Sequence, residues 1–199
     1  MTPPILKVAG LTLTELIITV ALAGIVIGLG VPSFTDTIRS NRSAAMSNEF
    51  ITALAYARSE AIKRGLPVTL RRSSSTASLW ENGFDVFVDR DGDGLFEDDG
   101  NATPCETNNQ LLTEDCLLKT YDAQTFAGFT VRSGDNFSCW VSFNNTGSAS
   151  SSGTSCTGTG LANDSFRLCP DSGDASKAKR IAINNTGRTR ITDGASSCP

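Results

Sequence analysis

Two arginines near the end of the sequence have the residue type and spacing of a phosphate clamp. In a strand, Arg188 and Arg190 would project to the same side, and the preceding run 185–187 (Asn-Thr-Gly) favours a tight turn that exposes them. Two guanidinium groups on one face can donate paired hydrogen bonds to phosphate oxygens. The alternative is that both arginines are merely solvated, or form ion pairs with Asp171 and Asp174, and the residues alone leave this open.

The basic charge around these arginines is local. The whole chain is acidic, because 17 Lys and Arg stand against 21 Asp and Glu, which gives a net charge of −4. From Asp171 onward, five basic side chains outnumber three acidic ones. We therefore predict weak contact with double-stranded DNA, without sequence preference, through Arg188, Arg190, Arg180, Lys179 and Lys177.

A second candidate site is the acidic segment "DRDGDGLFEDDG", residues 89–100. Three aspartates and a glycine fill positions 1, 3, 5 and 6 of a calcium-binding loop: Asp89, Asp91, Asp93 and Gly94. Position 12, which needs a bidentate carboxylate, falls on Gly100, so Asp98 or Asp99 would have to substitute. Asp and Gly also form ordinary hairpin turns, so Ca²⁺ at the Asp89–Asp99 loop and a simple turn are both open. No other cofactor is expected.

The sequence gives no support for catalysis. It contains no histidine, no G-x-S-x-G motif and no phosphate-binding glycine loop. Neither a general base of the usual kind nor an activated nucleophile can therefore be named, and we do not expect an enzyme.

The N-terminal region has the length of a membrane span. Leu11 to Val31 is an apolar run of 21 residues, which as a helix is about 32 Å long and close to the thickness of a bilayer core. A secretory signal peptide fits poorly, because the run is too long and no small-residue cleavage site follows it. The small residue, Gly10, precedes the run instead, so cleavage after Gly10 would leave the helix on the mature chain. Glu15 is then a carboxylate near the start of an apolar segment, where it is costly unless paired.

The helix is expected to continue beyond the apolar run. Apolar residues recur at helical spacing on one face: Phe34, Ile38, Met46, Phe50, Leu54, Ala57 and Ala61. Lys63, Arg64, Gly65 and Pro67 then form a clear stop signal. Pro32 and the glycines before it predict a kink or local melting between residues 24 and 32.

From residue 65 the sequence changes to short β-type runs separated by turn residues. Eight runs are expected to be strands: "PVTLRR", "FDVFVD", "LLKTY", "FTVRS", "SCWVSF", "SFRLCP", "RIAINN" and "RTRIT". Residues 144–160 are low in complexity and are expected to form a mobile loop. The predicted fold class is α+β, with the apolar face of the long helix packed on an antiparallel sheet.

Six cysteines, all between residues 105 and 198, indicate disulfides in an oxidising compartment. Zinc is the competing interpretation, but the chain has neither a C-x-x-C motif nor a histidine. Pairing of sequence neighbours gives Cys105–Cys116, Cys139–Cys156 and Cys169–Cys198.

The N-terminal motif resembles that of type IV pilins and pseudopilins. The match consists of Gly10, the following "LTLT" and Glu15, and Pro32 stands where the class often has a proline. Leu11 departs from the usual Phe, and Thr14 from the usual large apolar residue. Two further stretches, residues 49–70 ("EFITALAYARSEAIKRGLPVTL") and 166–198, resemble the GspH/FimT family of minor pilins and pseudopilins.

The resemblance implies a processing and assembly pathway. A prepilin peptidase would cut after Gly10, and the new N-terminus at Leu11 would be methylated. Glu15 would pair with the Leu11 amine of a neighbouring subunit and fix the register of the filament. The partners would be other major and minor pilins, with this chain at or near the pilus tip, and some FimT-type members take part in DNA uptake through arginines of the last turn. A type II secretion pseudopilin without DNA binding is the alternative.

These observations predict four segments. Residues 1–10 are a leader, 11–32 a transmembrane and filament-core helix, 33–64 an amphipathic helix, and 65–199 a disulfide-containing β domain. The expected location is the inner membrane, crossed once, with the C-terminal domain in the periplasm, and the pilus after assembly.

Overall fold

The computed structural model describes residues 10, 12–98, 105, 107–108, 111–112, 114–154, 156, 158, 160–195 and 197–198, apart from the side chains of residues 29–33, 36, 107–108 and 111–112. The chain divides into two compact units, Met1–Ser40 and Asn41–Pro199. Helix α1 (Leu13–Arg64) contributes to both units, and all described strands belong to the second.

Helix α1 begins and ends at recognisable caps. The Thr12 hydroxyl oxygen accepts the Glu15 N–H at 3.2 Å, as expected for an N-cap residue. At the other end Gly65 has φ of +72°, and its N–H donates to the Ala61 carbonyl at 2.9 Å. The backbone stays helical through Pro32, so the predicted local melting is absent; proline removes one hydrogen bond, and the neighbouring bonds of this 52-residue helix remain.

The first unit exposes its apolar side chains. More than half of the surface of each of the following is accessible: Leu13, Leu16, Ile17, Ile18, Val20, Leu22, Ile25, Val26 and Ile27. Among the residues that the structure describes, no helix combines the length and the apolar character needed to cross a membrane.

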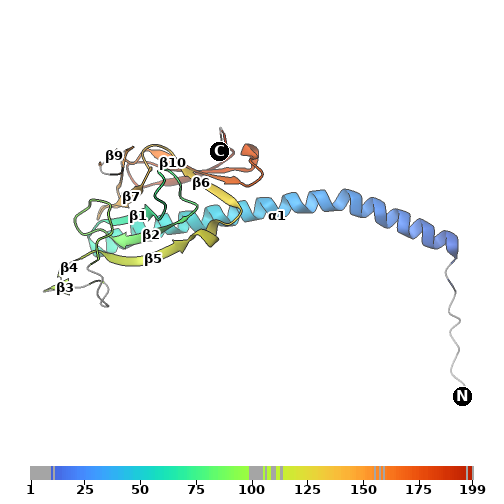
Figure 1. Cartoon of the computed structure of the whole chain (residues 1–199), viewed down its shortest axis with the longest axis horizontal. Helices are drawn as coiled ribbons and strands as arrows, with labels where there is room; N and C mark the ends of the chain where they lie inside the picture. Colours follow the sequence, from blue (N-terminus) through green and yellow to red (C-terminus); the bar gives the residue numbers. More distant parts are fainter. Residues whose placement is uncertain are drawn as a thin grey trace, which may run out of the picture. The chain divides into compact units, whose positions relative to one another are not determined.

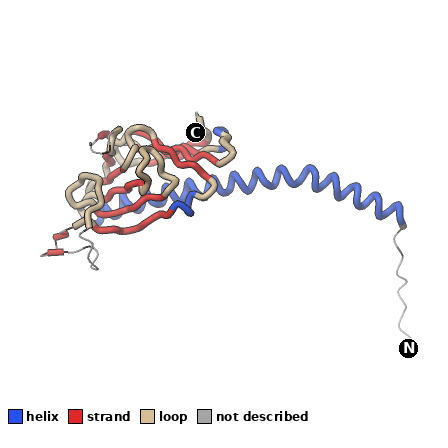
Figure 2. The backbone as a smooth tube through the Cα atoms, viewed as in Figure 1, coloured by secondary structure: helices blue, strands red, loops and turns tan. Residues whose placement is uncertain are grey.

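The second unit is built from short strands and two 3₁₀ helices (Figure 2). The elements are β1 (Val68–Arg72), β2 (Gly83–Val88), β3 (Thr107–Asn108), β4 (Leu111–Leu112), β5 (Cys116–Asp122), η1 (Ala123–Phe126), β6 (Phe129–Ser133), β7 (Trp140–Phe143), β8 (Ala149–Ser151), β9 (Gly160–Leu161), β10 (Asp164–Pro170), η2 (Ala175–Lys177), β11 (Lys179–Ile183) and β12 (Thr189–Asp193).

The strands form antiparallel sheets. The first sheet has the order β5-β2-β1-β7-β8-β9, the second β12-β11-β10-β6, and β3 pairs with β4. In Figure 1, β10 lies above the C-terminal part of α1 and β5 below it.

The core joins the helix to both larger sheets. Phe50 is fully buried on α1, and its ring centroid lies 5.3 Å from that of Phe84 on β2 and 4.6 Å from that of Phe166 on β10. The helix was predicted to cover one sheet, and it packs against two instead. The predicted α+β class, with a long helix on antiparallel strands, is confirmed.

The apolar stripe of the helix begins later than predicted. Phe34 and Ile38 are 70% and 47% exposed, whereas Phe50, Leu54 and Ala57 are fully buried. Between these two groups, two neighbouring residues of the helix contact the rest of the second unit. Arg42 Nη2 donates to the Ala127 carbonyl at 3.3 Å, and the hydroxyl of the buried Ser43 donates to the Lys177 carbonyl at 3.3 Å.

The low-complexity run contains a strand that sequence reasoning missed. β8 pairs with β7, and Ser151 and Ser152 are fully buried, so the loop prediction for residues 144–160 is wrong at β8. The Ser152 hydroxyl oxygen accepts the Cys139 N–H at 3.0 Å. Serine is small enough to fit there and supplies its own hydrogen bonds, so this strand lacks the usual apolar alternation.

Candidate functional site

A tight turn joins β11 to β12 and is closed by its own residues. The Asn184 carbonyl accepts the Gly187 N–H at 2.8 Å, and Asn184 Oδ1 accepts the Arg188 N–H at 3.0 Å. Gly187 has φ of +72°, a conformation that favours glycine. Gly187 therefore has the role in the turn that its type predicted, whereas the asparagine that closes the turn is Asn184, one position before the predicted run 185–187.

The same turn is attached to helix α1 and to the hairpin between β7 and β8. Arg58 Nε donates to the Gly147 carbonyl at 2.9 Å, and Arg58 Nη2 donates to the Thr186 carbonyl at 3.2 Å. A Cβ atom at Gly187 would lie 2.1 Å from the Gly147 oxygen, so only glycine permits this approach. The arginine-bearing turn thus has a rigid base.

Arg188 and Arg190 are both exposed and line one hollow together with Asn163 and Ala182. β12 begins at Thr189, so Arg188 belongs to the turn and not to the strand, where it was predicted. Among the described residues, no carboxylate lies within ion-pair distance of either guanidinium. The pairs with Asp171 and Asp174 that the sequence left open are therefore not formed.

The two predicted lysines have local carboxylate partners. Lys177 Nζ lies 3.9 Å from Asp174 Oδ2, and Lys179 pairs with Asp193. Hydrogen bonds from the Ser176 hydroxyl and N–H, followed by the charge of Lys177, lower the pKa of Asp174. Because a carboxylate already compensates each of these lysines, they contribute less positive charge to a phosphate-binding surface than the number of basic residues predicted.

Sequence reasoning missed one basic residue of this surface, Arg167 on β10. The buried neighbours Phe166 and Leu168 face the core, so Arg167 points to the opposite face. It stands directly across from Arg180 of β11 in the antiparallel register. The alternation of apolar and polar residues in "SFRLCP" indicated that Arg167 faces away from the core. The count of basic residues began at Asp171 and therefore did not include Arg167.

In the acidic loop, Asp89 is fully buried and organises the chain around it. Its Oδ1 accepts the Gly92 N–H at 2.7 Å, and its Oδ2 accepts the Thr69 hydroxyl at 2.7 Å and the Gly94 N–H at 3.0 Å. Burial raises the pKa of Asp89, although these hydrogen bonds oppose the rise. These contacts fit the turn interpretation, because both oxygens already have donors.

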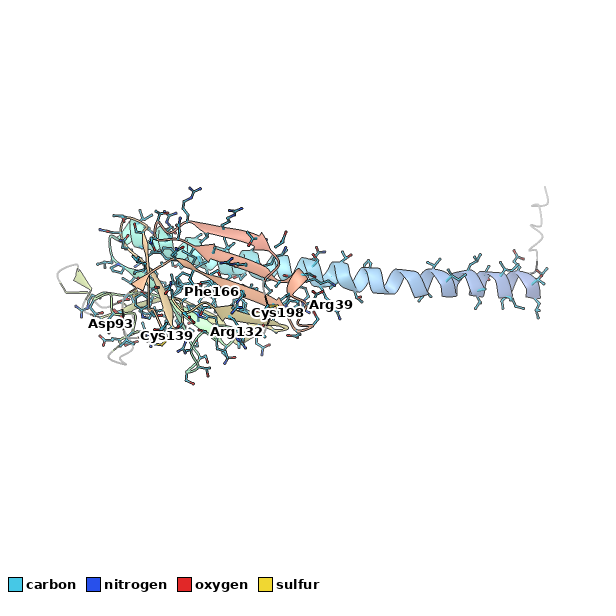
Figure 3. The ribbon with its side chains drawn as sticks, turned by 90° about the horizontal axis from the view of Figure 1, so that it is seen from above. Arg39, Asp93, Arg132, Cys139, Phe166 and Cys198 are labelled. Carbon is cyan, nitrogen blue, oxygen red and sulfur yellow. A yellow bond between two sulfur atoms is a disulfide. The ribbon has the colours of Figure 1, made fainter. Side chains whose placement is uncertain are left out.

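The other two aspartates lie close to Asp89. One carboxylate oxygen from each of Asp89, Asp91 and Asp93 lies within 4.8 Å of the others, and the last two are exposed. Figure 3 shows Asp93 toward one end of the β domain and Cys198 toward the other. Gly100, at position 12 of a calcium loop, and Asp99 lie outside the described residues. The donor set suits a hard cation such as Ca²⁺, whose binding here stays a prediction.

A buried carboxylate that the sequence analysis did not single out closes the acidic loop. Asp115 Oδ1 accepts the Arg90 N–H at 2.8 Å, and Asp115 Oδ2 accepts the Glu97 N–H at 3.1 Å. Burial raises the pKa of Asp115. No local pattern marks this residue, because its partners are 18 and 25 positions away.

The predicted processing and assembly residues lie at the start of the chain. Gly10 is exposed, and a Cβ atom built there would have no neighbour within 4 Å. Leu11 lies outside the described residues. Glu15 occupies the exposed first turn of α1, and Pro32 lies within the continuous helix.

Three disulfides join sequence neighbours, in the pairs that the sequence analysis favoured: Cys105–Cys116, Cys139–Cys156 and Cys169–Cys198. The third links β10 to the segment after β12 and therefore encloses the arginine-bearing hairpin.

Two crystal structures of the type IV minor pilin FimU from Pseudomonas aeruginosa share this fold. One superimposes with a TM-score of 0.53 at 17% sequence identity, covering 83% of this chain and 99% of FimU. The other gives 0.50 at 16% identity, covering 78% and 99%. No curated protein sequence matches the chain.

The sequence profile of a protein family described as "Type II transport protein GspH" matches residues 46–187. This range contains the buried half of α1 and the strands from β1 to β11. The family and the fold are those of structural pilin-like proteins, not of enzymes. Since the match covers well over half of the sequence, the chain belongs to the GspH family of pilin-like proteins.

Proposed function

We propose that the chain is a minor pilin that is cleaved after Gly10 and inserted at or near the tip of a type IV pilus. Residues 1–10 would be the leader, and residues 11–32 would hold the protein in the inner membrane before assembly. The apolar side chains exposed between Leu13 and Ile27 support this proposal, because they need lipid or neighbouring helices to cover them.

In the filament, the carboxylate of Glu15 would neutralise the amine that cleavage creates at Leu11 of a neighbouring subunit. An unpaired carboxylate among apolar helices is costly, so the correctly aligned pair would be favoured over other alignments. The partners are then a prepilin peptidase and the other major and minor pilins.

The C-terminal turn would bind double-stranded DNA. The single observation that carries this part is the pair Arg188 and Arg190, which line one hollow without a carboxylate partner among the described residues. Guanidinium groups held on a rigid turn are suited to phosphate oxygens. Because such contacts release counterions, binding should weaken as salt rises.

The second candidate is a minor pseudopilin of a type II secretion system. The family is described as a type II transport protein, and this description favours the second candidate. Such a subunit would share the processing and the helix but would need no affinity for DNA. The acidic net charge of −4 is compatible with this role.

A salt titration separates the two candidates. The full chain in non-ionic detergent would be titrated against a labelled DNA duplex at several NaCl concentrations. For the pilus role we expect binding at low salt, and the double variant Arg188→Gln/Arg190→Gln should lose about two units of the slope of log K against log salt. Equal binding by both proteins, or none by either, would favour the pseudopilin.

A further inference from the structure

Two guanidinium groups of the second sheet face each other across neighbouring strands. Arg167 on β10 and Arg180 on β11 are directly paired in the antiparallel register. Like charges in such positions destabilise a sheet unless something compensates them. Their common face is the one opposite to the core, because Ile181 and Phe166 next to them are buried.

In the described part of the chain, these arginines donate hydrogen bonds to neutral partners. Arg180 Nε donates to the Ser165 hydroxyl oxygen at 2.9 Å, and Arg167 Nη1 donates to the Ser197 hydroxyl oxygen at 3.2 Å. Among the described residues, neither guanidinium lies within ion-pair distance of a carboxylate. A guanidinium has five donors, so each retains several for a ligand.

Both arginines line a hollow of about 430 Å³ that also contains two carboxylates. Asp164 Oδ2 accepts the Asn136 N–H at 3.0 Å, and its Oδ1 accepts the Ser165 N–H at 2.7 Å. Asp193 pairs with Lys179. Lys179 therefore neutralises Asp193, whereas Asp164 keeps its negative charge because its donors are neutral amides. The two guanidinium groups outnumber this one carboxylate, so the hollow has a net positive charge of one.

The hollow adjoins the DNA-binding turn proposed above. In the register of β11 and β12, Ala182 is opposite Arg190, and Arg180 lies two positions before Ala182 on the same face. Arg190 and Arg180 are therefore diagonal neighbours, about 7–8 Å apart at the backbone. A chain of phosphates could contact Arg190, then Arg180 and Arg167.

We propose that the Arg167–Arg180 hollow binds a phosphate group of a nucleic-acid backbone and extends the contact surface of the C-terminal turn. This inference rests on the proposed DNA binding for the identity of the ligand. In this proposal, Arg167 takes the place of Lys177 and Lys179 in the DNA-contact surface that was predicted from the sequence.

The first test measures the salt dependence of DNA binding with the full chain in non-ionic detergent. Four arginine contacts predict a slope of log K against log salt of about −3.6, and Arg167→Gln should reduce it by about 0.9. Lys119→Gln is the matched control, because it removes one positive charge from β5 in the other sheet and should leave the slope unchanged. If Arg167→Gln retains the wild-type slope while the Arg188/Arg190 variant loses about two units, the hollow is not a contact and the proposed function stands.

The second test uses inorganic phosphate and does not depend on DNA. Phosphate should raise the Tm of the wild type above its value in chloride at equal ionic strength, and should not raise that of Arg167→Gln. Without phosphate, Arg167→Gln should keep or raise the Tm, because it removes a like-charge contact. A phosphate effect without any DNA binding would refute both the DNA-binding role and the assignment of the hollow to a nucleic-acid phosphate, and would leave a site for free phosphate. An absent phosphate effect, or competition by polyglutamate as strong as by DNA of equal charge, would overturn the inference.

Discussion

At the scale of single residues, the half-buried Arg58 of α1 connects distant parts of the structure. Its two hydrogen bonds reach carbonyl groups 89 and 128 positions later in the chain. Hydrogen bonds from charged donors contribute about 1.5–3 kcal/mol each to stability. The side chain thereby couples α1 to two hairpins.

We expect Arg58→Met, which keeps much of the apolar stem, to lower the free energy of unfolding by about 2–4 kcal/mol because both carbonyls lose their donor. Arg64→Met is the control, since Arg64 pairs with Glu60 in a partly exposed helical ion pair of about 0.2–1 kcal/mol. Denaturant unfolding would measure both. Equal losses would mean that the Arg58 contacts contribute nothing beyond an ordinary surface pair.

Glu15 also has two possible roles, which its contacts allow us to separate. Its N–H completes the Thr12 cap, and its carboxylate is exposed near the start of α1. If the charge fixes filament register, Glu15→Gln should permit cleavage but strongly reduce the amount of the subunit in sheared pili, measured by immunoblot. Thr12→Ala removes the cap and keeps the charge, so it should assemble nearly normally. The opposite ranking of the two variants would show that assembly depends on the Thr12 cap and not on the charge of Glu15.

Asp89 should make stability depend on pH. Its pKa in the folded state is raised by burial, so the folded protein binds the proton more tightly than the unfolded chain. The stabilising contribution of protonated Asp89 is therefore complete below the unfolded pKa of about 3.9 and is lost as pH rises through the folded pKa. We expect Asp89→Asn to cost more stability at acidic than at neutral pH in denaturant titrations. A cost that is greater at neutral pH would show that the hydrogen bonds to the carboxylate outweigh its burial.

At the scale of elements, the acidic loop gives a clear test of calcium binding. If Asp89, Asp91 and Asp93 hold Ca²⁺, millimolar Ca²⁺ should raise the Tm of the full chain relative to a chelator, by an amount that grows with the ratio of Ca²⁺ to its Kd. Asp91→Asn/Asp93→Asn should remove this difference while leaving the Asp89 turn intact. Identical melting curves in calcium and chelator would leave the turn as the only role of the loop.

The Cys169–Cys198 disulfide stabilises the second sheet by closing a loop. Its sequence separation of 29 residues corresponds to about 3–4 kcal/mol of loop entropy. The double variant Cys169→Ser/Cys198→Ser should therefore have a free energy of unfolding lower by that amount, seen as a lower denaturant midpoint. Its DNA affinity should fall at temperatures where β12 separates from β11. The Cys105–Cys116 pair, with a separation of 11, encloses none of these strands. Its removal is therefore the control for the effect on DNA affinity. An unchanged midpoint for the first variant would mean that packing alone holds the sheet.

At the scale of the whole molecule, periodic patterns predicted most of the fold. The apolar residues at helical spacing and the Lys-Arg-Gly-x-Pro ending placed the C-terminus of α1 at Arg64, and every predicted β-type run overlaps a strand. The burial of β8 and the Arg167–Arg180 pairing were not predictable in this way. They depend on which strands become neighbours, and that is decided by contacts between distant segments.

The candidate DNA-binding turn was also predictable only in part from the sequence. Asn-Thr-Gly before Arg188 indicated an exposed turn, because those residue types have local conformational preferences. The ion pair between Lys179 and Asp193 could not be anticipated from spacing, since it forms across two paired strands. Short-range preferences thus predicted the turn, and only the tertiary structure revealed which charges are compensated.

The disulfide around the C-terminal hairpin also has a mechanical consequence. A pulling force applied to the turn at Arg188 acts on both β11 and β12. The Cys169–Cys198 bond links the segment after β12 to β10, so β10 takes up part of the force on β12. Without that covalent link β12, an edge strand, would be held mainly by its ladder with β11 and could peel from it one hydrogen bond at a time. With both legs of the hairpin anchored, the bonds must bear the force together, so the hairpin is expected to resist tension applied at its tip.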